Sequence, residues 1–352
     1  MGLGRARDAS EAPEAGEATW STAARVLAAL ERAGAGRVSG ESLARSLGVS
    51  RAAVWKAIAS LRRGGCAIEA LSGHGYRLVT IEDRLRPELV APALTTRRFG
   101  QHLECYALLE STMDTATARA RAGHPEGTVV VAETQTAGRG RRGRTWHSPA
   151  GLNLYLSLVL RPAIATHQVG PVTLVAGLAL ARAVTEVAGF APGIKWPNDL
   201  YCGPRKLAGI LTELSAELDQ VHHVVVGVGL NVNAVVDDFP PELRELATSL
   251  RIEAGGRPFR RAHVLAAFLN HFEPAYDRFA AAGLEPFLPE IEATSAVRGR
   301  RVEVDLGARR FVGRALGVGP DGALTVELED GERIALHSGE ITAFAAEGAS
   351  PC

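Results

Sequence analysis

The sequence predicts an α+β protein made of three successive folded domains. Three observations lead to this prediction. Apolar residues recur with helical spacing in the first part of the chain, and several strand-like runs follow one another without an intervening helix in the middle. Short alternating strands separated by turns fill the region after residue 297. A chain of 352 residues is also too long for a single core of usual size.

The composition narrows the class of protein. The first twenty residues contain no apolar h-region, so they are predicted to be a disordered tail rather than a signal peptide. The longest apolar stretch, starting at Val172, has about half of the ~20 residues that a membrane span requires. Four scattered cysteines without a C-x-x-C pattern indicate neither a disulfide framework nor a metal site. We therefore expect a cytoplasmic protein with no membrane partner.

The first domain is expected to contain three helices followed by a β-hairpin. Ser39 and Ser50 are placed to cap the second and third helices, and Gly48 is placed to end the second. The inner faces of the three helices are formed by Val26, Leu27 and Leu30, by Leu43 and Leu47, and by Val54, Ile58 and Leu61. This spacing is typical of a helix-turn-helix, and the run CAIEALSGHGYRLV reads as its wing.

The outer face of the third helix is positively charged. It carries Arg51, Trp55 and Arg62 in its middle, with Lys56 and Arg63 at its edge. Between residues 37 and 77 there are seven basic and two acidic side chains, although the whole chain has a net charge of +0. Such a surface attracts a phosphate backbone, so we expect DNA binding; a solvated basic face or a protein-docking module is the alternative. The candidate DNA contacts are Ser50, Arg51, Ala52, Trp55 and Lys56.

The second and third domains differ in their pattern. Strand-like runs occur at 128–133, 152–160, 206–214 and 222–232, and helical runs at 112–122, 171–188 and 261–282. Consecutive strands without a helix between them favour a mixed sheet over a doubly wound one. The last domain reads as a small all-β barrel. The expected boundaries are a tail at 1–20, domains at 21–80, 101–296 and 297–352, and a linker at 81–100.

Residues 138–144, GRGRRGR, carry four arginines among three glycines. Glycines allow a close backbone approach and arginine forks match phosphate oxygens, so this segment predicts an anion site, most simply for phosphate. The string also fits G-x-G-x-x-G, but a further strand follows it instead of a helix, which disfavours a dinucleotide-binding loop. The sequence contains no P-loop motif.

A second cluster spans residues 195–214, KWPNDLYCGPRKLAGILTEL. We expect a hairpin with Lys195 and Lys206 near its two sides and Asp199 between them. Only three of the 39 basic residues are lysines, and two of them lie here, which favours a site over surface solubility. For Asp199, a turn-capping carboxylate and a catalytic or Mg²⁺-positioning group are equally good readings.

Together these motifs resemble a known family. The segments STMD from Ser111, ETQTAGRGRRGRTWHSP, NLYLSL, KWPNDL, RKLAGILTE and GVGLNVN occur in the order found in bacterial bifunctional biotin protein ligases and biotin operon repressors. The resemblance covers nearly the whole chain after residue 21. It implies a winged helix-turn-helix, a biotin/lipoate ligase-like catalytic domain and an SH3-like β-barrel.

The resemblance also implies a two-step reaction. The carboxylate of biotin attacks the α-phosphate of MgATP to give biotinoyl-AMP, and a lysine of the biotin carboxyl carrier protein of acetyl-CoA carboxylase then displaces AMP. Lys206, Arg139 and Arg141 are the implied catalytic residues. The implied biotin-binding residues are Ser111, Thr112, Met113, Gln135, Arg139, Gly140, Arg141 and Lys206. The implied nucleotide-binding residues are Gly138, Arg142, Gly143, Trp146, Asn198 and Asp199. A homodimer that binds operator DNA is expected.

Two positions depart from the family pattern. Many relatives carry Asn where Met113 stands, which puts a side-chain hydrogen bond to biotin in doubt. Relatives often place an Arg shortly after the Gly-Glu-Ile of the last domain, whereas Ile341 is followed here by Thr342, Ala343 and Phe344. Three alternatives remain: a ligase whose winged helix does not regulate, a sensor with an inactive ligase domain, and a relative specific for lipoate or octanoate.

Overall fold

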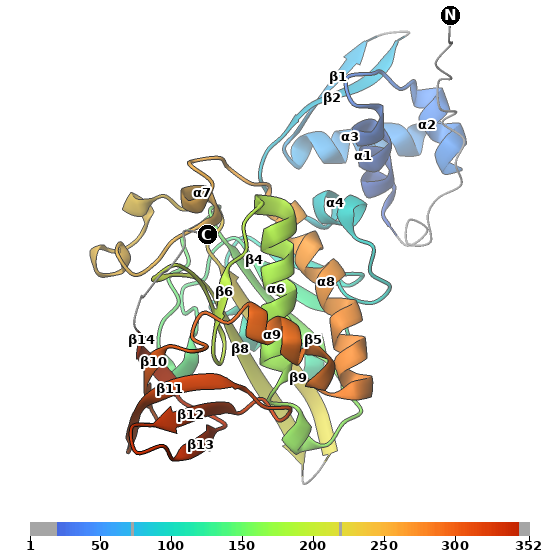
Figure 1. The fold of residues 1–352 in the computed structure, drawn as a ribbon. Helices are drawn as coiled ribbons and strands as arrows, with labels where there is room; N and C mark the ends of the chain where they lie inside the picture. The colour runs from blue at the N-terminus through green and yellow to red at the C-terminus, as the bar shows by residue number, and fades with distance from the viewer. Residues whose placement is uncertain (1–19, 72–73, 218–219, 345–352) are drawn as a thin grey trace, which may run out of the picture. The chain divides into compact units, whose positions relative to one another are not determined.

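The computed structural model describes residues 20–71, 74–217 and 220–344, and it divides into two compact units, Met1–Arg97 and Arg98–Cys352 (Figure 1). Apart from Trp20, the tail expected at 1–20 lies outside the described residues. Each unit is described by itself.

The first unit has the helix order that the sequence predicts. Its elements are α1 (Thr22–Ala33), α2 (Gly40–Leu47), α3 (Arg51–Arg63), β1 (Cys66–Leu71) and β2 (Gly75–Ile81). The side chains of Ser39 and Ser50 accept hydrogen bonds from the first turns of α2 and α3, and Gly48 ends α2 in a left-handed conformation. These local signals decide where the helices begin and end because each satisfies backbone groups that the helix cannot. The winged helix-turn-helix is confirmed.

The outer face of α3 is mostly open to solvent. Trp55 is 65% exposed, and the side chains of Arg51 and Lys56 are also exposed. Arg62 is exposed as predicted, and its guanidinium also donates two hydrogen bonds to the main-chain oxygen of Ile68 in β1. It therefore holds the wing against α3 while its charge stays on the exposed positive face.

The segment expected as a linker, 81–100, contains the short helix α4 (Pro87–Val90) and the 3-10 turn η2 (Ala91–Ala93). Leu89 and Val90 are buried, and α4 packs on α1. The sequence shows no periodicity here because four helical residues are too few to display one.

The second unit is built on a seven-stranded mixed sheet with the order β3-β4-β5-β9-β8-β7-β6. Only β3 and β4 are parallel, and the remaining neighbours are antiparallel, which confirms the predicted mixed sheet. The strands are β3 (Leu103–Tyr106), β4 (Val129–Ala132), β5 (Leu154–Leu160), β6 (Gly193–Lys195), β7 (Asp199–Cys202), β8 (Arg205–Glu217) and β9 (Gln220–Leu230).

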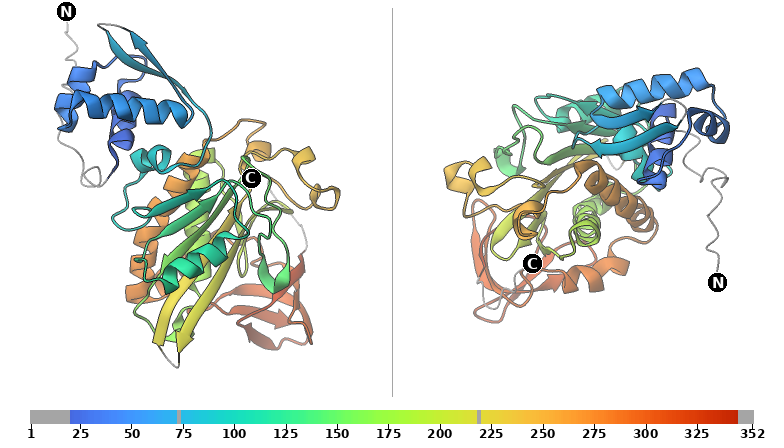
Figure 2. Two further views of the ribbon diagram at one scale, coloured as in Figure 1. Left: turned by 180° about the vertical axis from the view of Figure 1, so that it is seen from behind. Right: turned by 90° about the horizontal axis from the view of Figure 1, so that it is seen from above.

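Helices cover both faces of this sheet. Helices α6 (Val172–Ala188) and α8 (Arg261–Ala282) lie side by side on one face, and α5 (Thr112–Arg121) lies on the other (Figures 1 and 2). The segment Thr166–Ala188 is long and apolar enough to cross a membrane, but 72% of its apolar window is buried inside the fold. This burial is typical of a core helix. The remaining helical elements are η3 (Arg141–Gly143), η4 (Thr166–Gln168), η5 (Val236–Asp238), η6 (Pro241–Leu243), α7 (Leu250–Glu253), η7 (Glu285–Phe287) and α9 (Leu288–Ala293).

The C-terminal part of this unit is the predicted all-β domain. Its five antiparallel strands are β10 (Arg301–Asp305), β11 (Arg310–Val318), β12 (Leu324–Leu328), β13 (Arg333–Leu336) and β14 (Glu340–Phe344). They pair in the order β13-β12-β11-β10-β14. Among the described cysteines, Cys66 and Cys105 are outside any disulfide and Cys202 is disulfide-bonded, although the cysteine spacing indicated no framework.

Candidate active site

A cavity of about 480 Å³ opens where the loops at one end of the sheet meet the C-terminal domain. Its size is in the range of small-molecule sites. The segments that reach it are the N-terminus of α5, the loop between β4 and β5, the strands β6 to β9, the loop 231–249 and β14. All the predicted ligase-site residues except Gly138 and Gly143 line it.

The N-terminus of α5 forms one end of the cavity. Ser111 caps this helix by accepting a hydrogen bond from the backbone N–H of Met113. The Thr112 N–H donates to Gln135 Oε1 at 2.8 Å, and its hydroxyl accepts from Ser157 at 2.9 Å. The two segments that the sequence proposed as one binding pocket are thus joined directly, with hydroxyl and amide groups suited to a polar, uncharged ligand head.

Met113 lies deeper than its neighbours. It is 3% exposed and belongs to an apolar cluster with Ala116 and Val225. A side chain at Gly227 would place its Cβ 2.5 Å from Met113 Sδ, so the glycine in β9 makes room for the thioether. Met113 therefore packs as an apolar wall, in agreement with the doubt about a side-chain hydrogen bond there.

The glycine- and arginine-rich loop, residues 134–149, is held by close backbone contacts. A Cβ at Gly138 would lie 2.7 Å from the oxygen of Trp146, so only glycine fits there. Arg139 and Thr145 form an antiparallel bridge, and Arg142 at φ 56° and Gly143 at φ 74° reverse the chain between them. The loop is a tight hairpin-like turn without a following helix, as the sequence indicated.

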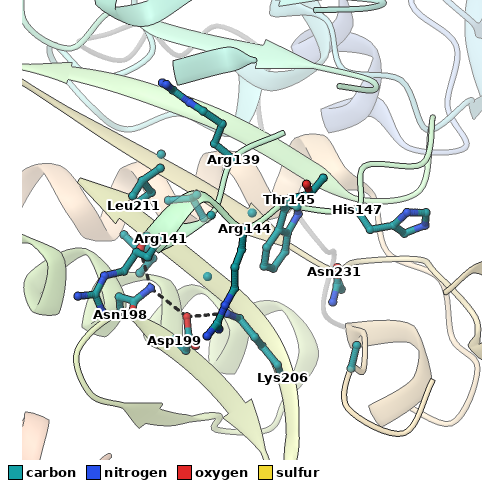
Figure 3. A pocket seen from close by; sticks show the side chains of 18 of the residues that line it. Arg139, Arg141, Arg144, Thr145, His147, Asn198, Asp199, Lys206, Leu211 and Asn231 are labelled. Carbon is teal, nitrogen blue, oxygen red and sulfur yellow. Dashed lines mark hydrogen bonds and ion pairs between the residues drawn. The ribbon is translucent and has the colours of Figure 1, made fainter. Parts of the chain in front are cut away.

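Two cations of the site are joined through a pair of polar side chains. Lys206 Nζ lies 2.8 Å from Asp199 Oδ1, which also accepts a hydrogen bond from Asn198 Nδ2 at 3.0 Å. Asn198 Oδ1 in turn accepts from Arg141 Nη1 at 3.0 Å (Figure 3). Burial lowers the pKa of Arg141, while the charge of Asp199 opposes this effect. Arg141 and Lys206 are thereby fixed on one wall of the cavity.

The strands that carry the lysines differ from the predicted single hairpin. Two turns rather than one separate Lys195 from Lys206, so β6, β7 and β8 form a three-stranded meander. Lys195 pairs in register with Asp199, and Lys206 with Tyr201. Lys195 Nζ lies 3.2 Å from the Tyr201 hydroxyl, and burial lowers the pKa of Lys195. The lysines still reach the same cavity because both flank β7.

Arg139 is placed differently from the other predicted catalytic residues. Its guanidinium lies 2.8 Å from Asp114 and 3.2 Å from Glu213 and points away from Lys206 (Figure 3). Its side chain is 41% exposed. Arg139 therefore lies at the rim of the cavity and not with Arg141 and Lys206.

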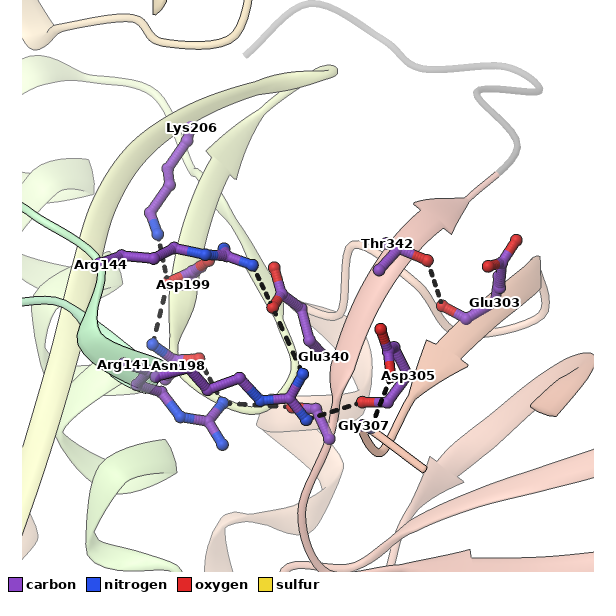
Figure 4. Close-up of polar contacts among 12 residues, drawn as sticks. Arg141, Arg144, Asn198, Asp199, Lys206, Glu303, Asp305, Gly307, Glu340 and Thr342 are labelled. Atoms are coloured by element: carbon purple, nitrogen blue, oxygen red, sulfur yellow. Dashed lines mark hydrogen bonds and ion pairs between the residues drawn. The ribbon is translucent and has the colours of Figure 1, made fainter. Parts of the chain in front are cut away.

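The C-terminal domain contributes to the wall. Arg144 forms an ion pair with Glu340, and Arg142 donates to the main-chain oxygen of Asp305 (Figure 4). Arg141 donates to the oxygen of Gly339. Three of the four loop arginines thus contact this domain. Ile341 and Thr342 also line the cavity, although no arginine follows Ile341 to connect this strand with a nucleotide.

Trp146 lies flat on a floor of glycines. A Cβ on Gly229 would come within 2.5 Å of its indole ring, and one on Gly209 within 3.0 Å. Lys206 Nζ lies 5.5 Å above the ring. The indole N–H is buried and has no hydrogen-bond partner within the described residues. The ring thus offers an apolar surface for a flat group and one unused donor.

Other lining residues were not identified from the sequence. His147 is one of them, and its ring contacts the oxygen of Asp238, which lies in the loop 231–249. The remainder include Asn231, Phe239, Leu243 and Leu246. The alternating glycines in GVGLN were the one available signal for the surface on which Trp146 packs, because glycine inside a strand often marks the close approach of another group.

Known proteins resemble this chain over most of its length. Three family models match it: the Biotin/lipoate A/B protein ligase family at residues 106–231, an HTH domain at 22–77 and the Biotin protein ligase C terminal domain at 298–342. The bifunctional ligase/repressor BirA of Bacillus subtilis (strain 168) is 40% identical over 294 residues, which cover 84% of this chain and 90% of that protein. The corresponding protein of Escherichia coli (strain K12) is 31% identical over 315 residues, covering 88% and 94%.

A solved structure is also similar. The biotin protein ligase from Aquifex aeolicus in complex with biotin and ATP has a TM-score of 0.60 and 30% sequence identity. The aligned region covers 68% of this chain and 97% of the Aquifex aeolicus chain.

Proposed function

The chain belongs to the family of bifunctional biotin protein ligases and repressors, and we propose that it uses ATP to attach biotin to a lysine of a carrier protein. The observation that carries this proposal is the joined arrangement of Arg141, Asn198, Asp199 and Lys206 on one wall of the cavity. The first step brings a carboxylate to a phosphate, so it needs fixed cations at the reacting oxygens.

In the first step, a carboxylate oxygen of biotin attacks the α-phosphorus of ATP and pyrophosphate leaves. Lys206 and Arg141 neutralise the charge that builds on the α-phosphate, and Asp199 and Asn198 hold these two cations in place. The backbone at Gly140 closes over the adenylate. The adenine packs on the ring face of Trp146.

The biotin end of the cavity is formed by Ser111, Thr112 and Gln135. Their hydroxyl and amide groups bind the ureido head, and Met113 packs against the apolar part of the ligand. Arg139 contributes through its backbone at the rim, because its guanidinium is held by Asp114 and Glu213. Gly138, Arg142 and Gly143 shape the loop around the nucleotide.

In the second step, the ε-amine of the carrier lysine attacks the acyl carbon of biotinoyl-AMP. An amide bond forms, the bond to phosphate breaks and AMP leaves. The carrier is the biotin carboxyl carrier protein of acetyl-CoA carboxylase. The same cations stabilise AMP as it departs, since the charge remains on the α-phosphate.

Magnesium enters as part of MgATP. Groups of three or more His, Cys, Asp or Glu side chains at metal-binding spacing are absent from the described residues. Mg²⁺ is commonly bound by one or two carboxylates together with substrate phosphates. Asp199 is the carboxylate best placed for it, because it is half-buried beside Lys206.

The winged helix gives the second activity, repression of biotin synthesis genes. Ser50, Arg51 and Ala52 begin α3, and Trp55 and Lys56 follow on its exposed face. We propose that this face enters the major groove of operator DNA. Biotinoyl-AMP orders the glycine- and arginine-rich loop, favours a homodimer and so pairs two winged helices on a palindromic operator.

The experiment that tests the ligase is incubation with ATP, Mg²⁺ and biotin, followed by addition of a carrier domain. Pyrophosphate release that depends on biotin, and a carrier mass increased by one biotinoyl group, are expected. Parallel reactions with lipoate and octanoate test the substrate. Release with either of these acids but not with biotin would overturn the proposed substrate, and no release with any acid would overturn the ligase.

A further inference from the structure

A wholly buried arginine outside the lining of the cavity has no part in the proposed chemistry. Arg261 is the first residue of α8 and is 0% exposed. Burying a guanidinium is costly even when it is paired, and the N-terminus of a helix disfavours a cation. Both the burial and the helix position of Arg261 lower stability, so its presence indicates a role other than stabilisation.

The partners of Arg261 lie at the two ends of one loop. Its Nη1 is 2.6 Å from Glu133 Oε2, and it donates to the main-chain oxygen of Asn153 at 3.2 Å. Glu133 directly follows β4, and Asn153 directly precedes β5. Everything between them is the segment that carries Gln135 and the arginines. A backbone hydrogen bond from Gly151 to Glu133 closes the same stem.

Asn153 extends this contact to the second loop of the cavity. Its amide oxygen accepts from the N–H of Val232 at 2.9 Å, and its amide nitrogen lies 3.4 Å from Asn231 Oδ1. Asn231 donates to the oxygen of Thr248, whose N–H donates to the oxygen of Lys206 at 2.9 Å. Hydrogen bonds therefore run without a gap from Arg261 to the backbone of the proposed catalytic lysine.

We propose that Arg261 is a positioning residue for adenylation. By bridging Glu133 and Asn153 it fixes the distance between the two ends of the β4–β5 loop, and so sets where Arg141 meets Lys206. A displacement of about 1 Å in such a site is enough to cost about 10²-fold in rate. This inference rests on the proposed adenylation reaction.

The test compares single and double variants. Arg261→Met removes this cation from the half-buried Glu133, so it lowers both stability and activity. The double variant Arg261→Met/Glu133→Leu removes the buried charge together with its half-buried partner, and replacing such an ion pair by apolar residues is often neutral for stability. We expect this double variant to keep a melting temperature near that of the unaltered protein while kcat for biotinoyl-AMP formation falls about 10- to 100-fold.

A matched pair serves as the control. Arg182 of α6 binds Glu290 of α9 through its Nε at 2.7 Å, and neither residue lines the cavity. Arg182→Met/Glu290→Leu should leave kcat unchanged. Wild-type kcat in the Arg261/Glu133 double variant, with stability lost only in the single variants, would make the pair purely structural and overturn the inference.

Two further measurements keep the inference testable. If the double variant does not fold, Arg261→Lys replaces the planar fork by a single ammonium group, and a lower kcat at unchanged melting temperature is expected. Unchanged kcat contradicts the inference. Hydrogen exchange of residues 134–149 needs no catalysis: faster exchange in the Arg261 variants than in the Arg182 control supports the inference, and equal exchange opposes it. An unaltered protein that releases no pyrophosphate would instead overturn the proposed function.

Discussion

The cations of the cavity and the cations of α3 are arranged in opposite ways. In the cavity, Lys206 is paired with Asp199, and Arg141 donates to Asn198. On α3, Arg51 and Lys56 are exposed, and neither forms an ion pair with another of the described residues. The cavity cations are therefore held in place before a ligand binds, whereas the side chains on α3 can adjust to the position of a ligand.

This difference corresponds to the two tasks proposed for the chain. Adenylation needs charges at fixed positions, because reorganisation during the reaction raises the barrier. Binding a phosphate backbone needs a positive surface with adaptable side chains, and it is sensitive to salt. The comparison predicts that changes in the cavity alter kcat steeply, while changes on α3 alter affinity gradually and leave ligation intact.

The largest effect is expected for the paired lysine. Lys206→Ala should slow biotin-dependent pyrophosphate release by about 10²- to 10³-fold, since a fixed charge at the reacting phosphate is lost. Arg139→Ala should cost less than about tenfold, because its guanidinium is held at the rim by Asp114 and Glu213. Equal losses in both variants would show that Arg139 turns inward on ligand binding, and the comparison of fixed cations would then fail.

The second effect concerns the glycine floor. Gly229→Ala would place a Cβ 2.5 Å from the indole of Trp146 and must displace the ring. ATP affinity should fall by about 10- to 100-fold if the ring packs on adenine. Gly177→Ala in α6 is the control, because its Cβ would meet Ile210 at an ordinary 3.5 Å. Equilibrium binding of ATP measures both, and unaltered affinity in Gly229→Ala would remove Trp146 from the nucleotide site.

The first unit was the easier part to predict from sequence. Ser39, Gly48 and Ser50 mark the helix ends through contacts within three or four residues, so the signal and the structure are local. The buried stripe of Val54, Ile58 and Leu61 follows from the helix period alone. Arg62 was predicted on the exposed face of α3, but its hydrogen bond to β1 left no signal, because it depends on how the hairpin folds back.

The cavity was predicted in its residues but not in its arrangement. Motif resemblance brought Lys206 and Arg141 together, yet only the sheet order shows that Asn198 and Asp199 join them. The outward turn of Arg139 depends on Glu213, which is 74 residues away in the chain. Arg261 left no local signal, since its partners Glu133 and Asn153 precede it by more than one hundred residues.

A smaller effect is expected on α3. Replacing Arg51 and Lys56 by Ala should weaken operator binding about tenfold at moderate salt and reduce the slope of log K against log salt by about 1.8. Ligation should be unchanged. Arg84→Ala, which removes a cation already paired with Glu82, is the control and should leave the slope nearly constant. A loss of ligation in the α3 variant would mean that the two activities are not separable.

The smallest effect is expected for Lys195, a cavity cation that contacts a tyrosine hydroxyl. Burial lowers the pKa of Lys195, Lys206 and Arg144 lower it further, and Asp199 opposes them. Bound phosphate favours the charged amine, so the contribution of Lys195 to ATP affinity is complete below its pKa and is lost as pH rises through it. Because that pKa is lowered, the loss begins at a lower pH than for an ordinary lysine.

Burial also raises the pKa of Tyr201, whose hydroxyl contacts Lys195, so the phenol does not account for such a change. We expect ATP affinity to fall about threefold as pH rises, and the fall should begin below the ordinary lysine pKa of about 10.4. In Lys195→Arg the charge persists, and the affinity should stay level as pH rises. In Lys195→Met the ATP affinity should be low and should not change with pH. A decline that persists in both variants would assign the titration to another group and place Lys195 outside the nucleotide site.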